Sequence, residues 1–545
     1  MKRKQSFIKG AAILGIAALF TKLLGAVYRI PYQNITGDEG MFVYQQVYPL
    51  YSLLLTVATA GVPIAISKMV SERLAQSNPI GARRLFWTAA TVLTTTGVIF
   101  FILLFFSAPW IADWMGSQEM LTLPIRAVAF SLLIVPLTST IRGYFQGYQD
   151  MVPTAVSQVA EQLVRVGTIL FAAWWMMSIG AGVVLAGTGA VFGAFTGALA
   201  ALIALLFFWQ RRLKGEKGFQ ETVVKEESVG EMMKRLFALA IPICFGSLVL
   251  PLFSLIDSFT VANVLEWSGW TKALSIQEKG VYDRSQPMIQ FASFFASAVS
   301  LSIVPAIAEA QAQGKLQTVV DRSGQAINMT LLLGLPASIG LAIVAAPTNI
   351  MLFKNDAGSA AMSIFAFTTI FSTLGMTSSG ILQGLGYVML PARNLMIGAL
   401  TKLGLNLLLI PIWDIRGAAM ATVIGYGVAT VFNLWAITSK FPGMWQRIRF
   451  GRLFVANIWM GVAAYGVMWL LIQLTQELDS LRLAMTITSL SAVVVGVIVY
   501  TYAVFRFGVL KRKDVERIPK LKRLLPLLDS LRLFGKEEHH HKESN

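Results

Sequence analysis

The feature of this sequence that most constrains its fold is the recurrence of apolar segments long enough to cross a lipid bilayer. A helix needs about 20 predominantly apolar residues to span a hydrocarbon core of about 30 Å. Such segments recur along all 545 residues, of which 55% are hydrophobic and only 13% are charged. Soluble domains carry about 25% charged residues. The sequence therefore predicts an all-α integral membrane protein.

We expect about fourteen membrane-spanning helices from these segments. Residues 1–30 are interpreted as the first of them rather than as a cleaved signal peptide. The apolar run continues through Lys22 and Arg29 without a small-residue cleavage site. The predicted spans are residues 7–32, 41–70, 84–109, 120–148, 154–178, 183–209, 236–262, 284–311, 325–346, 358–386, 392–412, 417–438, 453–475 and 484–505.

Basic residues collect in alternate loops, and this pattern predicts the orientation of the chain in the membrane. They precede the first span, surround the loops after the second, sixth and twelfth spans, and follow the last span. The other loops carry acids instead, such as Asp38, Glu39 and Asp113. By the positive-inside rule, both termini are cytoplasmic. The net charge of +17 also fits a nucleic-acid-binding protein, but these basic residues lie between apolar runs, so we expect no nucleic-acid partner.

Two parts of the chain resemble each other at an offset near 237–238 residues. Residues 142–155 (RGYFQGYQDMVPTA) match residues 379–392 (SGILQGLGYVMLPA) with one inserted residue. The shared positions are Gly143 with Gly380, Gln146 with Gln383, Gly147 with Gly384, and Pro153 with Pro391. A weaker match joins residues 61–72 with 300–311. The matches predict a parallel six-helix repeat whose two lobes flank a V-shaped central cavity; chance similarity between Gly- and Ala-rich helices is the alternative.

The repeat and the charged breaks divide the chain into five predicted regions. They are an N-lobe at 1–210, a cytoplasmic linker at 211–235, a C-lobe at 236–440, two extra helices at 441–508 and a basic amphipathic tail at 509–545. The tail alternates basic residues with leucines. It is expected to lie on the anionic cytoplasmic leaflet, and docking to a partner is the alternative.

Ionisable residues inside the predicted spans are the candidate functional residues, because each costs roughly 2.5–3.5 kcal/mol at the bilayer centre. They are Lys22, Arg29, Arg126, Arg142, Glu161, Arg165, Asp257, Arg284 and Lys402. Glu161 and Arg165 stand at i and i+4, so this intramembrane pair fits a structural role as well as a functional one. Arg126 and Arg142 lie near span ends, where long side chains reach the interface.

Four of these cations, Lys22, Arg29, Arg284 and Lys402, have no acid one turn away on their own helix. An unpaired cationic cavity attracts an anion, and arginine suits bidentate contact with phosphate. Asp257 is the one acid deep in the second half of the chain. An ion pair between Asp257 and Lys402 is favoured. Binding of a coupling cation by Asp257 with Asn406 and Thr422 is the alternative.

The sequence contains no enzyme signature such as HExxH, GxxxxGK[ST] or GxSxG. Its three histidines, His539–His541, lie in the polar tail and are interpreted as solvated. The single cysteine, Cys244, lies in an apolar run and is interpreted as a buried inert thiol. We therefore expect a protein that is not an enzyme and holds no cofactor or metal. Coupling to membrane potential, protons or sodium stays open.

Residues 22–72 (KLLGAVYRIPYQNITGDEGMFVYQQVYPLYSLLLTVATAGVPIAISKMVSE) closely resemble the opening of stage V sporulation protein B-like and YtgP-like polysaccharide-transport proteins. These proteins belong to the multidrug/oligosaccharidyl-lipid/polysaccharide (MOP) exporter superfamily, which includes the MurJ-type lipid II flippases. The resemblance covers essentially the whole chain. It implies a two-lobe, alternating-access transporter of undecaprenyl-diphosphate-linked precursors in the bacterial cytoplasmic membrane.

The resemblance also implies roles for particular residues. Lys22 takes the place of an arginine in the TKLLG run, and Arg284 matches the arginine of an Asp–Arg pair. Arg29 lies one residue beyond the next expected arginine, and Glu39 matches an acid that precedes MFVY. The implied roles are diphosphate binding for Lys22, Arg29 and Arg284, and a gate or counter-charge for Glu39.

A sodium site found in some members of the superfamily gives a second comparison. Asp257 and Thr422 fit that site, but Lys402 and Asn406 stand where its span-eleven ligands are expected. A cation at a ligand position favours the Asp257–Lys402 ion pair over sodium binding.

The expected function is transport of lipid II from the inner to the outer leaflet. The alternatives are a flippase for another polyprenyl-linked glycan, a cation-coupled drug exporter, whose cleft should be acidic, and a membrane-embedded glycan polymerase or scaffold. The expected partners are the lipid-linked oligosaccharide, membrane lipids and cell-wall synthesis proteins, and the protein is expected to be a monomer.

Overall fold

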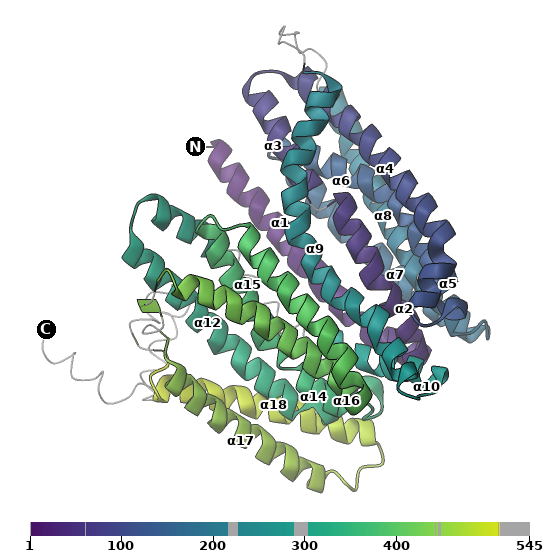
Figure 1. Cartoon of the computed structure of the whole chain (residues 1–545), viewed down its shortest axis with the longest axis vertical. Helices are drawn as coiled ribbons and strands as arrows, with labels where there is room; N and C mark the ends of the chain where they lie inside the picture. Colours follow the sequence, from purple (N-terminus) through teal and green to yellow (C-terminus); the bar gives the residue numbers. More distant parts are fainter. Residues whose placement is uncertain are drawn as a thin grey trace, which may run out of the picture. The chain divides into compact units, whose positions relative to one another are not determined.

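The computed structural model describes residues 2–59, 61–215, 227–287, 303–441, 443–444, 448–510 and 512. The regular structure in these residues is helical, with no strand (Figure 1). Nine helical segments of the described chain are long and apolar enough to cross a membrane. The predicted all-α, multi-pass membrane protein is therefore confirmed. The finer prediction of fourteen spans remains a prediction, because most of the eighth span lies outside the described residues.

The chain forms two compact units. One comprises Met1–Pro287 with Lys402–Ala418, and the other comprises Met288–Thr401 with Ala419–Asn545. The first contains α1 (Lys2–Val27), α2 (Arg29–Thr59), α3 (Val62–Ala75), α4 (Pro79–Trp114), α5 (Gln118–Ala129), α6 (Ser131–Gly147), α7 (Val152–Ser178), α8 (Val183–Gly215), α9 (Val229–Trp267) and α10 (Lys272–Asp283). The second contains α12 (Leu316–Ile343), α13 (Ala345–Phe353), α14 (Ser359–Phe365), α15 (Thr368–Gly384), α17 (Phe450–Leu474) and α18 (Leu481–Arg506). Residues of α16 (Met389–Thr438) belong to both.

The compact units group residues 236–287 and 402–418 with the N-terminal helices. The lobe boundaries at 210 and 236 remain a prediction. Residues 216–226 of the predicted linker and most of the predicted tail lie outside the described residues, as do His539–His541.

Two of the helices contain a turn, so each holds more than one straight helical piece. In α2, Gly37 has φ 69° and ψ −167°, and only glycine adopts such a left-handed φ readily. Residues before this turn pack back on those after it. The hydroxyl groups of Tyr28 and Tyr44 lie 2.6 Å apart, and Tyr32 donates to the carbonyl of Gly40 over 2.9 Å. The second predicted span therefore begins directly after Gly37.

The turn in α16 is formed by Trp413 and Asp414, of which Asp414 has φ 52°. On its far side Gly417 lies so close to Leu409 that an added Cβ would be 2.3 Å from the Leu409 carbonyl oxygen. The chain thus folds back here too, at the point predicted to separate the eleventh and twelfth spans.

Helix packing inside each unit recurs at the spacing of the predicted repeat. In the first unit, a Cβ added to Gly147 of α6 would lie 2.6 Å from the Cβ of Val70 of α3. In the second unit, a Cβ added to Gly384 of α15 would lie 2.8 Å from the Cβ of Ile307. Both residues of the second pair follow those of the first by 237 positions. The same small residue thus admits the same close helix contact in each unit.

A second pair of contacts follows the same rule. A Cβ on Gly97 of α4 would lie 2.8 Å from the ring of Pro136, and one on Gly334 of α12 would lie 2.8 Å from the hydroxyl of Thr373. These positions are again 237 residues apart. These contacts agree with the predicted repeat, which itself remains a prediction.

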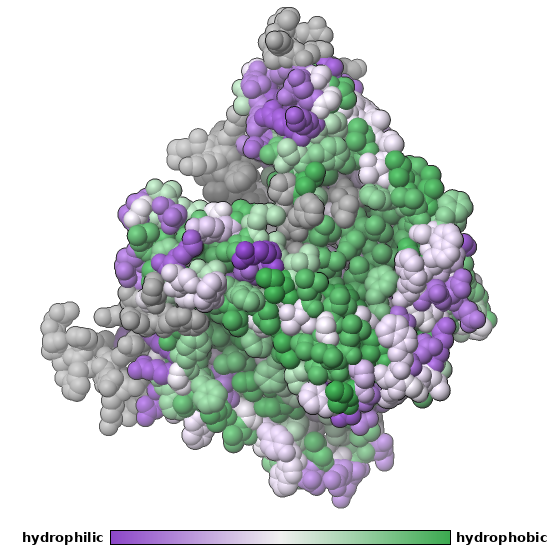
Figure 2. Space-filling view, viewed as in Figure 1, coloured by the Kyte–Doolittle hydropathy of each residue, from purple (hydrophilic) through white to green (hydrophobic). Residues whose placement is uncertain are grey.

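The outward-facing helix surfaces are apolar, as expected for contact with lipid. Phe106 and Trp110 of α4 are each 66% exposed, and α17 exposes Phe454 and Trp469. Figure 2 shows apolar side chains over the helices and a hydrophilic patch over the ends of α3 and α9. Such a distribution is stable only where lipid rather than water covers the helices.

Candidate functional site

The buried ionisable residues of the first unit form the candidate site. Arg284, at the end of α10, is completely buried. Its Nε donates to Asp38 Oδ1 over 2.6 Å, and its Nη2 donates to Asp38 Oδ2. Gln33 also donates to Asp38 Oδ1, over 2.9 Å. Arg284, which has no acid one turn away on its own helix, is therefore paired with a carboxylate at the start of the second span.

The turn at the start of the second span and α10 are in close contact. A Cβ on Gly280 of α10 would lie 2.1 Å from the carbonyl oxygen of Asp38. The Arg284–Asp38 pair thus forms where two backbones touch. Glu39, the residue expected as gate or counter-charge, is exposed, and the structure places Asp38 against Arg284 in its stead. The role of Glu39 remains a prediction.

The three predicted diphosphate ligands lie in three different environments. Lys22 is exposed on α1, and Arg284 is held by Asp38. Arg29 is only 2% exposed, with its guanidinium carbon 5.3 Å from the centre of the Tyr48 ring. The Nε and Nη1 of Arg29 have no hydrogen-bond partner among the described residues. Arg29 therefore carries a buried charge that its neighbours satisfy only in part.

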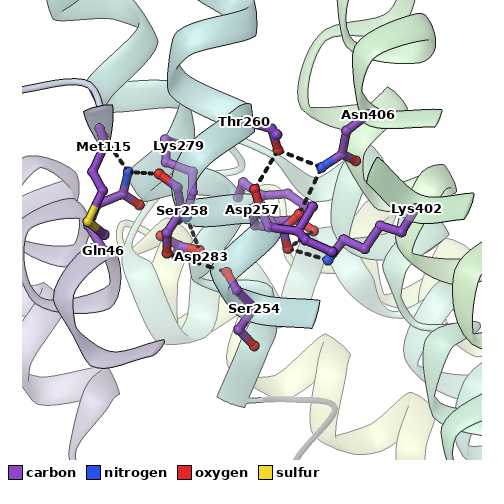
Figure 3. A network of polar contacts seen from close by, with 12 residues as sticks. Gln46, Met115, Ser254, Asp257, Ser258, Thr260, Lys279, Asp283, Lys402 and Asn406 are labelled. Carbon is purple, nitrogen blue, oxygen red and sulfur yellow. Dashed lines mark hydrogen bonds and ion pairs between the residues drawn. The ribbon is translucent and has the colours of Figure 1, made fainter. Parts of the chain in front are cut away.

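Asp257 and Lys402 form a buried ion pair, with Lys402 Nζ 2.7 Å from Asp257 Oδ2 (Figure 3). Lys402 also donates to the carbonyl of Phe253 over 2.7 Å. Asn406 donates to Asp257 Oδ1 over 3.2 Å, and Tyr282 donates to Asp257 Oδ2 over 3.0 Å. Two oxygen acceptors, one from the Asp257 carboxylate and one from the Phe253 carbonyl, thus hold the Lys402 ammonium.

Thr422, proposed alongside Asp257, is buried on α16 in the other compact unit. Its role remains a prediction.

Two buried polar contacts of this region were missed from the sequence. Lys279 Nζ donates to both carboxylate oxygens of Asp283, over 2.7 and 2.6 Å. Their i, i+4 spacing could have indicated the pair. Gln46 donates to the carbonyl oxygens of Met115 and Ser258, over 2.7 and 2.6 Å (Figure 3). No sequence signal indicates this contact, because Gln46, Met115 and Ser258 come from distant parts of the chain.

Glu161 is shared by two arginines. Its Oε1 lies 2.6 Å from Arg165 Nη2, and its Oε2 lies 2.8 Å from Arg142 Nη2. Arg142 also donates to Ser157 over 2.9 Å. The predicted pair on α7 is thus part of a triad, because α6 brings Arg142 to the same carboxylate. Arg126 donates instead to a backbone carbonyl, that of Phe105.

Electrostatic shifts outside the spans follow from burial. The pKa of Glu278 on α10 is raised by burial and by the nearby carboxylates of Asp414 and Asp38. Burial lowers the pKa of Arg73, which pairs with Glu227 over 2.5 Å. Cys244 is half-buried, and its sulfur accepts from the backbone N–H of Gly61 over 3.3 Å. No cluster of metal-ligating side chains occurs among the described residues.

Long apolar helices around buried, paired charges define the class of this protein as a multi-pass membrane protein. Residues 7–311 match the model of the family described as "Polysaccharide biosynthesis protein". The chain belongs to this family. Because its members are transporters, the expectation that the chain is not an enzyme is confirmed.

Curated relatives match over nearly the full length. The chain is 33% identical to the uncharacterized membrane protein YabM of Bacillus subtilis (strain 168), over 94% of each chain. It is 29% identical to the lipid II flippase MurJ of the same organism, over 94% of this chain and 97% of the relative. It is 26% identical to that organism's stage V sporulation protein B, over 96% and 99%.

Solved structures show the same fold. The lipid II flippase MurJ in an inward closed conformation matches with a TM-score of 0.64 at 13% identity, over 90% of this chain and 98% of that one. An inward-facing multidrug resistance MATE family transporter of the MOP superfamily matches with a TM-score of 0.63 at 15% identity, over 80% and 99%. At these identities the likeness concerns the fold alone.

Proposed function

We propose that this protein is an alternating-access flippase that moves lipid II, an undecaprenyl-diphosphate-linked precursor, from the inner to the outer leaflet of the bacterial cytoplasmic membrane. The full-length similarity to the flippase MurJ supports a lipid-linked substrate. Moving a diphosphate and a polar headgroup unaided through hydrocarbon has a prohibitive free energy, so a flippase needs a polar path with cations.

The observation that carries the proposal is the bidentate contact between Arg284 and Asp38. A carboxylate occupies the face of the guanidinium that two phosphate oxygens would fit equally well. In the proposed mechanism the diphosphate replaces Asp38 at Arg284, with Lys22 and Arg29 as further ligands. Loss of the Asp38 contact frees α10 from the turn at Gly37, so substrate binding weakens a contact between helices.

The ion pair of Asp257 and Lys402 is the proposed coupling or structural element. The Lys402 ammonium occupies the position beside Asp257 that a sodium ion would need. The ion pair therefore favours coupling of transport to protons or to the membrane potential rather than to sodium. Asn406 donates to the Asp257 carboxylate and shares this role. The role of Thr422 remains a prediction from the sequence.

The test is rescue of a flippase-depleted bacterial cell by variants of this protein. Arg29→Ala and Arg284→Ala are expected to abolish growth while membrane expression stays at the wild-type level. Arg126→Ala is the matched control, since Arg126 is an intramembrane arginine that contacts only a carbonyl and an aromatic ring in the described chain. Full rescue by both Arg29→Ala and Arg284→Ala would refute the assignment of these residues.

A second candidate is a flippase for another polyprenyl-linked glycan. The similarity to stage V sporulation protein B along 96% of the chain favours keeping it. The substrates of the two candidate functions share the diphosphate and differ in the sugar. Purified protein in liposomes that translocates lipid II faster than other lipid-linked sugars supports the first candidate, and the reverse preference supports the second.

A further inference from the structure

Four charged side chains of the first unit join the end of α3 to the start of α9. Arg73 Nη2 lies 2.5 Å from Glu227 Oε2, and Arg235 Nη2 lies 2.5 Å from Glu72 Oε2. Arg235 Nη1 also lies 3.6 Å from Glu227 Oε1. Each side thus gives one acid and one base, and each charge of α3 faces an opposite charge at or just before the start of α9. We name these four residues the ion-pair cluster.

The contact between α3 and α9 continues beyond the ion-pair cluster. A Cβ added to Gly61, the N-cap of α3, would lie 2.1 Å from the carbonyl oxygen of Ala240, and the Gly61 N–H donates to the sulfur of Cys244 over 3.3 Å. Leu236 of α9 and Met69 of α3 are buried in one apolar cluster. In lipid, apolar contact between helices gains little over contact with acyl chains. The balance between contact and separation of these helices is therefore close enough for ion pairs to shift it.

Water reaches the ion-pair cluster, which distinguishes it from the buried pair of Arg284 and Asp38. The ends of α3 and α9 form a hydrophilic patch at the surface (Figure 2). The side chain of Arg235 is 47% exposed, whereas that of Arg284 is 0% exposed. Separating an exposed ion pair costs little, because water solvates both partners and dissolved salt screens their attraction. Separating a buried pair leaves an uncompensated charge, so only the contact at the ion-pair cluster opens at low cost.

The ion-pair cluster also crosses the boundary between the predicted lobes. Helix α3 lies within the predicted N-lobe at 1–210, and α9 runs from the predicted linker into the predicted C-lobe at 236–440. In alternating access, one repeat moves against the other around the substrate site, so contacts between the lobes must part on the side of entry. The positive-inside rule places the joined ends of α3 and α9 in the cytoplasm, which is the side of entry under the proposed function.

We propose that the ion-pair cluster is an electrostatic latch, which holds the cytoplasmic ends of α3 and α9 together and opens to admit the lipid-linked substrate. The latch itself rests on the pairing and the exposure of its four charges. Its part in substrate entry rests on the proposed function. Because exposed charges are screened by dissolved ions, the latch weakens as ionic strength rises.

The single natural cysteine reports on the latch, because Cys244 lies at the contact between α3 and α9. The test is the rate at which an uncharged maleimide labels Cys244 in the purified full-length protein in detergent. Arg235→Glu places a third acid beside Glu72 and Glu227, and it should raise the labelling rate about fivefold, as for the loss of one exposed ion pair. Adding Glu72→Arg restores an opposite charge and should return the rate most of the way to that of the wild type.

Arg83→Glu is the matched control for the change of charge. Arg83 is exposed near the start of α4, at the same end of the unit, and forms no ion pair with the described residues, so this variant should label as the wild type does. High salt should speed labelling of the wild type more than that of Arg235→Gln, which lacks the pairs with Glu72 and Glu227. The latch is overturned if Arg235→Glu labels at the wild-type rate, or if adding Glu72→Arg fails to slow it, as general misfolding of Arg235→Glu predicts.

A cross-link separates the latch from the proposed function. In a Cys244→Ser background, Glu72→Cys and Arg235→Cys joined by a short bifunctional thiol reagent should stop transport of lipid II in liposomes. Each single cysteine variant, treated with the same reagent, should keep it. Transport that continues after cross-linking overturns the role of the latch in substrate entry. If the unmodified protein transports no lipid-linked sugar, the proposed function fails, and the labelling rates alone decide the latch.

Discussion

Most buried cations of the first unit form an ion pair with an acid, either one turn away on the same helix or on another helix. Lys279, Arg284 and Lys402 are each at most 1% exposed, and each contacts an aspartate. Arg29 departs from this rule within the described residues. Because breaking one side of a buried ion pair leaves an uncompensated charge, these pairs should dominate the residue-level energetics.

The pair of Asp257 and Lys402 allows this to be measured by a double-mutant cycle. Asp257→Asn alone should destabilise the protein by about 3–5 kcal/mol, because the Lys402 ammonium is left without its counter-charge. Adding Lys402→Gln should recover much of that loss, since no buried charge then remains. Chemical unfolding of Asp257→Asn, Lys402→Gln and the double variant in detergent tests both statements. Additive effects of the two substitutions would contradict the pairing.

Glu278 should make stability depend on pH. Its native pKa is raised above the usual 4.5, first by burial and then by the carboxylates of Asp414 and Asp38. The native state therefore binds this proton more tightly than the unfolded state, and the contribution of Glu278 to stability falls as pH rises through the native pKa.

Glu278→Gln should accordingly match the wild type near pH 4 and unfold at a higher temperature near pH 7. Unfolding midpoints of both proteins across this range provide the measurement. An equal difference between the proteins at every pH would show that Glu278 does not titrate in this way.

At the scale of elements, helix packing depends on glycines that admit close contact. Gly147 on α6 meets Val70 on α3, and Gly384 meets Ile307 at the same offset in the second unit. The apolar pattern of a membrane helix does not reveal which face meets a neighbour, because lipid-facing and buried residues are both apolar. Small residues are the better indicator of helix contacts in membranes.

Gly147→Ala should therefore destabilise the protein by about 1–3 kcal/mol through overpacking. Its methyl group would lie 2.6 Å from the Val70 side chain, whereas one on Gly167 of α7 would meet no atom within 4 Å in the described structure. Gly167→Ala is the matched control, and helix propensity alone should make it neutral or stabilising by about 0.5–1 kcal/mol. Unfolding midpoints that fall equally for the two variants would contradict the packing role.

At the scale of the whole molecule, the orientation in the membrane can be tested on one helix. Exposed residues Arg83 and Asp113 lie near opposite ends of α4, whose 36 residues exceed the length of a span. The positive-inside rule places Arg83 in the cytoplasm and Asp113 outside.

In a Cys244→Ser background, a membrane-impermeant thiol reagent applied to whole cells should label Asp113→Cys but label Arg83→Cys only after lysis. Labelling of Arg83→Cys in intact cells would reverse the predicted orientation. Since Cys244 is the only natural cysteine, the background variant itself serves as the unlabelled control.

The fold class was predictable from the sequence, whereas the partners of the charges were predictable only in part. Glu161 with Arg165 lie on one helix, so spacing indicated that contact. Asp38 with Arg284, and Gln46 with Ser258, are 246 and 212 residues apart. No periodicity relates such positions, and the acid expected near Arg284 was Glu39, next to the residue that makes the contact.

The amino-acid sequence by itself determined that the chain lies in a membrane and that it folds as helices. These properties follow from composition, segment length and spacing, which act locally along the chain. The tertiary structure decided which buried cations contact a carboxylate, as Arg284 contacts Asp38 and Lys402 contacts Asp257. That outcome depends on distances between distant helices, because a buried charge is stabilised only by groups within a few ångströms of it.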